Sequence, residues 1–439
     1  MPDGNLIQAV PALLVGIGLL APALWLSWRL PTGLLLVALA ALAVRPQLYF
    51  DAPAVGIGWG FHQTLLLAAL LINAAKHGVR KTANWPIVAL AAVFALNLAF
   101  GELDPRVKLP MMLSAFGVLA LPWTFTQVVL APGSRRACAL TIALLPLLSV
   151  AVKGILVLYG VPFFPHRLEA ATGNAAVFAL LGFTGFAVAL HESTRRGRPF
   201  LAIVAAVNLA LVVLSGSRMG IFACGLFLVV YAAASPALRE MAQKRWIEVL
   251  VGAGLVGAAA WYYWPTLAWR AFESRGNGIR MSGRDQLWPF YYDQFQMSPI
   301  FGRGLGSGFV GALYWMDFNV TAPHNEYLHL LVVGGVVGAA ACFAAIFWWF
   351  RQLWQTVASD DRRFLIGLLP ALATYAFIDN VLIYATGLAL FAYLGVLRTR
   401  SAPGRQDGAT RRRQKTSSST SGKRRQPRRE HGERDLAGV

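Results

Sequence analysis

The sequence predicts an all-α membrane protein, a polytopic bundle of about 12 transmembrane helices. Of its 439 residues, 57% are hydrophobic and only 13% are charged, and the mean hydropathy is +0.55. A soluble protein of this size needs more polar surface than this composition supplies. Apolar runs of about 20 residues, long enough as helix to cross ~30 Å of hydrocarbon, recur along the chain. Such runs form helices because lipid cannot pair with backbone N–H and C=O groups.

Thirteen apolar runs between residues 1 and 397 are candidate membrane spans. They cover residues 6–28, 30–44, 59–75, 83–100, 109–131, 137–158, 174–191, 200–215, 219–234, 247–264, 328–350, 363–379 and 381–397. The run at 30–44 is short for a span and follows Arg29, so the stretch 6–44 contributes either one crossing or two. One crossing gives 12 spans with both chain ends on the same side, and two crossings give 13 spans. The shortness of the run at 30–44 favours 12 spans.

Basic residues concentrate in alternate loops between these runs, and this alternation predicts the orientation of the chain. The clusters are Lys76/Arg80/Lys81, Arg135/Arg136, Arg195/Arg196/Arg198, Arg239/Lys244/Arg245 and Arg351/Arg362/Arg363. Loops rich in Lys and Arg stay on the cytoplasmic side of a membrane. Loops of the opposite phase, among them the SGSR turn at 215–218 and the break at 379–380, are therefore expected outside the cytoplasm.

A basic tail, residues 398–439, follows the final apolar run and accounts for about half of the net charge of +19. It carries 13 Lys or Arg against 4 Asp or Glu, with many Ser, Gly and Gln residues and no apolar period. Such a composition is typical of a disordered segment. We interpret the tail as a cytoplasmic topology anchor that contacts anionic membrane lipids, in preference to a segment that binds nucleic acid.

One loop, residues 265–323, is too long and too aromatic for a simple connection between helices. Loops longer than about 15 residues are usually functional or disordered, and this one is rich in Trp, Tyr and Phe. A Ser-x-x-Asp pattern at 282–285 resembles a capping box, and the helical spacing of the apolar residues after it predicts an amphipathic helix over 283–296. A glycine-rich turn at 301–309 follows, and then Pro323, which suits the first turn of the next helix.

Four polar residues stand out on the side predicted to be external. Arg218, in the SGSR turn, is either an interfacial anchor or a ligand for an anion. Arg284 falls in the first turn of the predicted amphipathic helix, where a cation opposes the helix dipole, and this favours a functional reason for it. Arg303 lies among glycines that let backbone amides approach a ligand, although a plain flexible loop fits equally well.

The fourth residue, His324, follows Pro323 at a helix start, where the helix dipole and nearby arginines disfavour the imidazolium form. A neutral ring is the state that a general base needs. The alternative for His324 is a hydrogen-bonded interfacial histidine without a catalytic role.

No pattern in the sequence predicts a metal site. His324 and His329 lie about 140° apart around a helix, so they do not share a ligand as an i, i+4 pair does. The acids of the 265–323 loop are scattered, without a D-x-D pair. The three cysteines lie far apart inside apolar runs, at Cys138, Cys224 and Cys342. Arginines, whose forked donors match phosphate oxygens, would neutralise a bound diphosphate, so we expect a site without metal or cofactor.

Four short motifs follow one another between Thr172 and Gly335: SGSRMG, SGR-D-x-L-W, F-G-x-G and HNEYLH. Together, in this order and on the same predicted face, they resemble the O-antigen ligase family and its O-antigen polymerase relatives. The resemblance implies a polytopic helix bundle similar to the C-type glycosyltransferases, with one large periplasmic loop. It also implies a place in the bacterial inner membrane, with the active site facing the periplasm and the tail in the cytoplasm.

The resemblance further implies a reaction and the residues that perform it. Enzymes of this kind transfer a glycan from undecaprenyl diphosphate, and in the ligases the acceptor is a sugar hydroxyl of lipid A-core. Carried over to this chain, His324 is the base or orients the acceptor, and Asn325 and Asp379 are weaker candidates. Asp379 is a candidate because an acid at the last external break can orient His324 or the acceptor. The donor diphosphate is bound by three arginines, Arg218, Arg284 and Arg303.

Three alternatives to a ligase remain open. A polymerase of similar architecture uses the same donor and a lipid-linked acceptor. A protein O-glycosyltransferase is of the same class but often has a folded periplasmic extension near its C-terminus, where this chain has the basic tail. A transporter for an anionic lipid-linked substrate needs paired charges or broken helices near the middle of the membrane. Lys153 is the main candidate for such a charge, but it lies near a span end, where its side chain can reach the interface.

Overall fold

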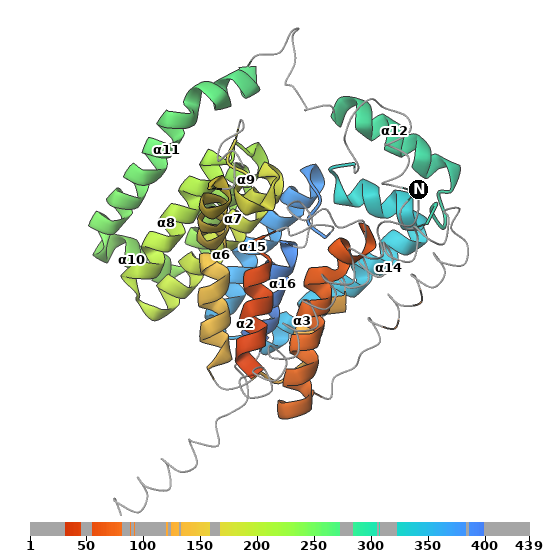
Figure 1. Cartoon of the computed structure of the whole chain (residues 1–439), viewed down its shortest axis with the longest axis horizontal. Coiled ribbons are helices and arrows are strands. Elements are labelled where there is room, and N and C mark those ends of the chain that lie inside the picture. The colour runs from red at the N-terminus through yellow and green to blue at the C-terminus, as the bar shows by residue number, and fades with distance from the viewer. Residues whose placement is uncertain are drawn as a thin grey trace, which may run out of the picture. The chain divides into compact units, whose positions relative to one another are not determined.

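The computed structural model is helical over the residues that it describes, apart from one isolated bridge between Val79 and Val128 (Figure 1). Those residues are 31–44, 55–80, 88, 92, 120–121, 124–130, 133–158, 167–272, 284–304, 307, 323–382 and 386–398. The chain divides into two compact units, Met1–Arg400 and Ser401–Val439, of which the second lies outside the described residues. The predicted run at 6–28 and most of those at 83–100 and 109–131 also lie outside them. The predicted all-α class is confirmed for the described part of the chain.

The helices follow the predicted apolar runs closely. In chain order the elements are α2 (Pro31–Ala41), α3 (Val55–His77), α6 (Ser134–Val157), the 3-10 turn η2 (Ala170–Thr172), α7 (Ala175–Arg196), α8 (Pro199–Leu214), α9 (Arg218–Ala234), α10 (Pro236–Lys244), α11 (Trp246–Phe272), α12 (Arg284–Met297), α14 (Glu326–Thr356), α15 (Ser359–Ile378) and α16 (Gly387–Arg398). Their sequences are rich in Leu and Ala, which have high intrinsic helix propensity, so the apolar runs and the helix propensity both predict helices here.

The end of α11 differs from the prediction. The 265–323 loop was expected to begin at Pro265, but α11 continues through this proline to Phe272. A proline inside a helix removes one backbone hydrogen bond and does not always end the helix, particularly in apolar surroundings. The connection between α11 and α12 is shorter than predicted for this reason.

Among the described residues, three helices, α6, α7 and α14, are both long enough and apolar enough to cross a membrane. A fourth span results if α9 and α10, which are bent by 99° relative to each other, are counted together. α8 and α16 are apolar but shorter. The number of about 12 spans therefore remains a prediction from the sequence.

α7 begins and ends at residues that suit helix ends, and its end forms the tight turn to α8. The Asn174 side chain caps α7 by accepting hydrogen bonds from the backbone N–H groups of Ala176 and Val177, at 2.8 and 3.2 Å. Gly197, with φ +62°, ends α7 in the left-handed conformation that glycine adopts without strain. Pro199 then occupies the first turn of α8. The chain reverses direction at residues 197–199, and the arginines on either side of Gly197 therefore lie together at this turn.

α7 is the central helix, and almost all of its side chains are buried. Two glycines let its neighbours approach closely. A Cβ at Gly182 would meet the Val212 side chain of α8, and one at Gly185 would meet the side chains of Pro146 on α6 and Asn208 on α8. The close packing of α6, α7 and α8 thus depends on small residues, as is usual where helices pack in membranes.

The helix directions define two ends of the bundle. One end gathers the starts of α6 and α15 and the ends of α7, α9 and α16; there Arg135 donates a hydrogen bond to the carbonyl of Leu397 at 3.4 Å. The opposite end gathers the starts of α7 and α9 and the end of α15; there the Tyr375 hydroxyl donates to the carbonyl of Ala176 at 3.0 Å. We call these the Arg135 end and the Asp379 end.

A buried polar network joins four helices at the Arg135 end. Asp361, at the start of α15, is fully buried and accepts hydrogen bonds from Nη2 of Arg135 at 3.1 Å and Nε2 of His191 at 3.0 Å. The Tyr393 hydroxyl of α16 donates to Oε1 of Glu192 on α7 at 3.0 Å. Because each buried charge has hydrogen-bonding partners, the network stabilises the arrangement of α6, α7, α15 and α16.

Replacing Asp361 by alanine is expected to lower the free energy of unfolding by about 3–5 kcal/mol, because Arg135 loses its buried carboxylate partner. The adjacent Asp360 is the matched control: its side chain is 52% exposed and pairs with Arg363 at the surface. Asp360→Ala is expected to cost less than about 1 kcal/mol. Thermal unfolding of the detergent-purified proteins measures both, and equal losses for the two variants would contradict the structural role of the network.

Candidate active site

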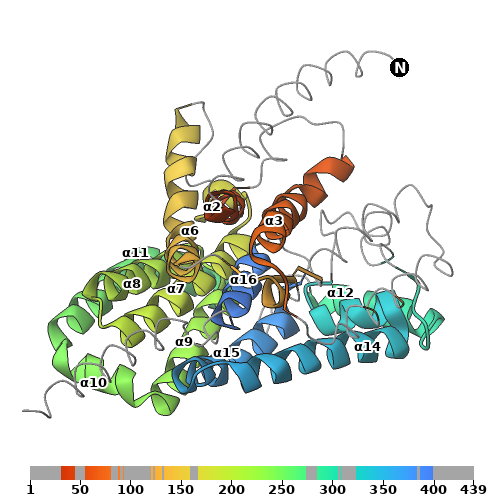
Figure 2. The same ribbon diagram turned by 90° about the horizontal axis from the view of Figure 1, so that it is seen from below.

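The amphipathic helix predicted at 283–296 is confirmed as α12, and it packs against the first turns of α14 (Figure 2). Leu287 and Tyr291 of α12 and Val332 of α14 are buried together as one cluster. The indole N–H of Trp288 donates to the carbonyl of Pro323 at 3.0 Å. α12 therefore holds the segment that carries His324 against its own aromatic face.

Arg284, the first residue of α12, reaches the end of α15. Its Nε donates a hydrogen bond to the carbonyl of Ile378 at 3.1 Å. The predicted conflict of this arginine with the dipole of its own helix is resolved by the structure, since a cation at the C-terminus of α15 is favoured by that helix's dipole. Arg284 is thus fixed one residue away from Asp379.

His324 and Asp379 form a hydrogen-bonded pair. Nδ1 of His324 lies 2.9 Å from Oδ1 of Asp379, whose side chain is 3% exposed. Because a carboxylate oxygen accepts, the Nδ1–H group donates, and in the neutral form of the ring Nε2 carries the lone pair. The His324 side chain is 26% exposed, so solvent reaches the ring. An imidazole oriented in this way by a buried carboxylate is suited to accept a proton at Nε2.

The backbone at His324 is strained, with φ +48° in the left-handed region. The strain follows from the way α14 begins: Asn325 caps the helix by accepting from the N–H of Leu328 at 3.0 Å, and the helix proper starts at Glu326. Pro323, which was predicted in the first helical turn, therefore lies before the cap. Strained residues cluster at functional sites when the surrounding contacts hold them in place, and the Asp379 and Trp288 contacts do so here.

Glu326 is a buried residue of the HNEYLH motif and was not among the predicted site residues. Its Oε2 accepts hydrogen bonds from the N–H groups of Val381 and Leu382 at 2.9 and 3.0 Å, and its Oε1 lies 3.3 Å from Nδ1 of His329. It ties the chain directly after Asp379 to the first turn of α14. An acid at the start of an otherwise apolar span was the available signal for this role.

α14 is broken at Gly335, where φ is +61° and ψ is −167°. The predicted span at 328–350 lies within α14, which is long and apolar enough to cross a membrane, but the break at Gly335 was not predicted. The break leaves backbone groups of α14 without helical partners, and the loop 299–304 supplies them. The N–H groups of Arg303 and Gly304 donate to the carbonyls of Val332 and Val333, at 2.8 and 3.0 Å. In the other direction, the N–H groups of Val336 and Val337 donate to the carbonyls of Pro299 and Ile300, at 2.8 and 3.1 Å.

We name the pairing of residues 299–304 with residues 332–337 the glycine clasp, because Gly302 and Gly335 cross at its centre. A Cβ on either glycine would collide with the backbone of the opposite segment. The clasp fixes the backbone of Arg303, whose Nη1 donates to Oε1 of Gln294 on α12. Loop 299–304, α12 and α14 are thereby held as one group.

The structure places the remaining candidates less directly. Arg218 is the first residue of α9, follows its N-cap Ser217, and is half-buried; the direction of α9 places it at the Asp379 end. Asn325 has a structural role as the cap of α14. The residues that the structure joins through hydrogen bonds at the end of α15 are His324, Asp379 and Arg284, while Arg303 is joined to α12 and α14.

Metal ligands are not grouped in the part of the chain that the structure describes. No three His, Cys, Asp or Glu side chains there lie close enough together to hold an ion. Cys138, Cys224 and Cys342 are buried and free.

Fold and site together define an all-helical protein with membrane-type apolar helices and a histidine–carboxylate pair suited to moving a proton. Comparison with known families is consistent with this class: residues 201–343, about a third of the chain, match the model of the family described as O-antigen ligase. The predicted resemblance to the O-antigen ligase family is thereby confirmed. The matched segment includes Arg218, Arg284, Arg303 and His324 and ends before Asp379. No curated protein matches the chain.

Proposed function

We propose that this protein is an O-antigen ligase, which transfers a glycan from undecaprenyl diphosphate to a sugar hydroxyl of lipid A-core. The observation that carries the proposal is the His324–Asp379 pair beside Arg284, with His324 and Arg284 inside the segment that matches the O-antigen ligase family. A histidine oriented by a carboxylate can remove a hydroxyl proton, and this transfer requires that step.

The proposed reaction forms one bond and breaks one. His324 Nε2 accepts the proton of the acceptor hydroxyl as the oxygen attacks the anomeric carbon of the glycan. The bond from that carbon to the diphosphate oxygen breaks, and undecaprenyl diphosphate leaves with the electron pair. Asp379 holds the ring in position and stabilises the imidazolium that forms. The proton then passes from His324 to solvent, which reaches the ring.

The leaving group is a diphosphate, whose charge increases in the transition state. Guanidinium groups donate paired hydrogen bonds to phosphate oxygens and so stabilise this charge. We assign this role to Arg284 first, because its position beside Asp379 is fixed by Ile378 O, and to Arg218 and Arg303 with it. Asn325 contributes by capping α14 and so positioning His324.

The proposed site faces the periplasm, and the Arg135 end faces the cytoplasm. In support, Arg80, Arg135, Arg195 and Arg196 lie in loops or helix ends on the Arg135 side: Arg80 and Arg135 donate to the last carbonyls of α16, and Arg195 and Arg196 end α7. Positive residues are retained on the cytoplasmic side of the inner membrane. The basic tail then continues from the end of α16 into the cytoplasm, and the bundle has about 12 spans.

Transport is the alternative that the structure bears on. The break in α14 is of a kind that transporters use to bind ions, but here the exposed backbone groups pair with loop 299–304. Lys153, which was expected to reach the interface, is instead 4% exposed within the bundle. The freed backbone groups of α14 are therefore already paired within the chain, and neither feature favours transport over transfer.

Deletion of the gene, followed by gel analysis of lipopolysaccharide, tests the proposed function. We expect lipid A-core without O-antigen and an accumulation of polymer linked to undecaprenyl diphosphate, both reversed by the intact gene. Core that carries a single repeat unit would identify a polymerase instead. Lipopolysaccharide with unchanged O-antigen would contradict both assignments.

A further inference from the structure

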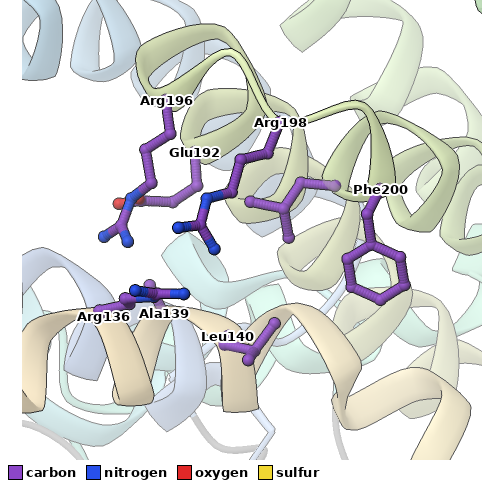
Figure 3. A pocket seen from close by; sticks show the side chains of 8 residues that line it. Arg136, Ala139, Leu140, Glu192, Arg196, Arg198 and Phe200 are labelled. Carbon is purple, nitrogen blue, oxygen red and sulfur yellow. The ribbon is translucent and has the colours of Figure 1, made fainter.

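A pocket with three arginines lies at the Arg135 end, away from the proposed active site (Figure 3). Arg136 comes from the first turn of α6, and Arg196 and Arg198 come from the turn between α7 and α8. Figure 3 shows Arg196 and Arg198 extending from the hairpin turn toward Arg136 on the facing helix. Two basic loops that are far apart in the sequence thus supply guanidinium groups to one space.

The single acid in the pocket lining, Glu192, is bonded to groups that hold it in the buried network. Its carboxylate accepts from Tyr393 at 3.0 Å and from Arg195 at 3.2 Å, and it also pairs with Arg196. With three arginines against one acid, the lining keeps a net charge of +2. Guanidinium groups that converge in this way repel one another, and an oxyanion between them removes the repulsion.

The rest of the pocket is apolar. Leu140 lies one helical turn beyond Arg136 on α6, and Phe200 lies just beyond Arg198 on α8; they are 39% and 57% exposed. Leu140 and Phe200 therefore lie farther from the ends of α6 and α8 than Arg136 and Arg198 do. A ligand that fits has an anionic head next to the arginines and an apolar chain that continues over Leu140 and Phe200.

We propose that this pocket binds the phosphate of an anionic phospholipid, with an acyl chain along Leu140 and Phe200. A soluble phosphate fits the arginines but leaves the adjoining apolar surface uncovered. The bound lipid links α6 to the α7–α8 hairpin at the end where Arg135, Asp361 and Glu192 already join the helices. The site does not depend on the proposed transferase activity.

The test uses the full-length protein, purified in neutral detergent and delipidated, with phosphatidylglycerol as the probe and phosphatidylcholine as the uncharged comparison. Binding is measured by native mass spectrometry over a range of lipid concentrations. The double variant Arg136→Gln/Arg198→Gln is expected to bind phosphatidylglycerol about tenfold more weakly than the wild type. The control Arg239→Gln/Lys244→Gln removes the same charge from α10, and a change of less than about twofold is expected.

Phe200→Asn, which leaves every charge in place, is expected to weaken binding several-fold through loss of the chain contact. Equal losses in the pocket variant and the α10 control would overturn the proposal, because they would show a general effect of charge. Displacement of phosphatidylglycerol by millimolar inorganic phosphate or glycerol phosphate would also overturn it, in favour of a soluble anion. Equal binding of phosphatidylcholine to the wild type would contradict the anionic headgroup.

Discussion

His324→Ala is expected to lower the rate of glycan transfer by about 10²–10⁴-fold, because the acceptor hydroxyl loses the group that takes its proton. Asp379→Asn is expected to lower it by at least about tenfold, since an amide donor facing Nδ1 favours the tautomer with the proton on Nε2. The rates are measured with purified protein in liposomes, with lipid-linked glycan as donor and lipid A-core as acceptor.

Tyr327→Phe is the control for these variants, because it lies three residues from His324 and removes only a hydroxyl that donates to Ala373 O at 3.1 Å. Its rate is expected to stay within about twofold of the wild type, in keeping with the small effect of one exposed hydrogen bond. Wild-type transfer by His324→Ala at a normal level of folded protein would exclude this residue as the base. A rate for Asp379→Asn equal to that of the wild type would exclude an orienting role for the carboxylate.

Gly335→Ala is expected to destabilise the protein by at least about 2–3 kcal/mol and to reduce the yield of folded protein. The new methyl group would collide with the backbone of residues 300–302, and alanine disfavours the φ of +61°. Thermal unfolding in detergent measures the loss. Because the clasp fixes Arg303, the folded fraction that remains is also expected to bind the donor more weakly.

The neighbouring Gly334 is a matched control for the clasp. It lies outside the left-handed region, and its Cβ would come no closer than 3.4 Å to other atoms, at the N of Ala339. Gly334→Ala is therefore expected to change stability by less than about 1 kcal/mol, or to increase it through helix propensity. Equal destabilisation by both substitutions would show that the crossing of Gly302 and Gly335 is not essential.

The helices could be predicted from sequence because their apolar runs are long and rich in strong helix formers. α6, α7 and α15 begin and end within a few residues of the expected positions, and α12 was predicted from a cap pattern and its apolar spacing. Hydropathy reports the cost of placing a segment in water, so it marks which segments are buried. It carries no information on which segments pair with one another.

The features that could not be predicted all depend on such pairing. The break at Gly335 occurs in an apolar segment, and only the loop 299–304 makes it possible. Glu326 bonds to residues 381 and 382, and Arg135 to Asp361, across long stretches of chain. The candidate residues of the site were proposed from their chemistry and from the family resemblance, and a contact of Asp379 with His324 was among the possibilities. The bonds of Arg284 to Ile378 and of Arg303 to Gln294 came from the structure alone.

Transfer by the purified protein in liposomes, without added divalent ions and with a chelator present, tests the central claim most directly. With labelled glycan on undecaprenyl diphosphate and lipid A-core as acceptor, the wild type is expected to form labelled lipopolysaccharide and to release undecaprenyl diphosphate in equal amount. His324→Ala is expected to do neither above background. Absence of transfer by the folded wild type, or equal transfer by the variant, would contradict the account.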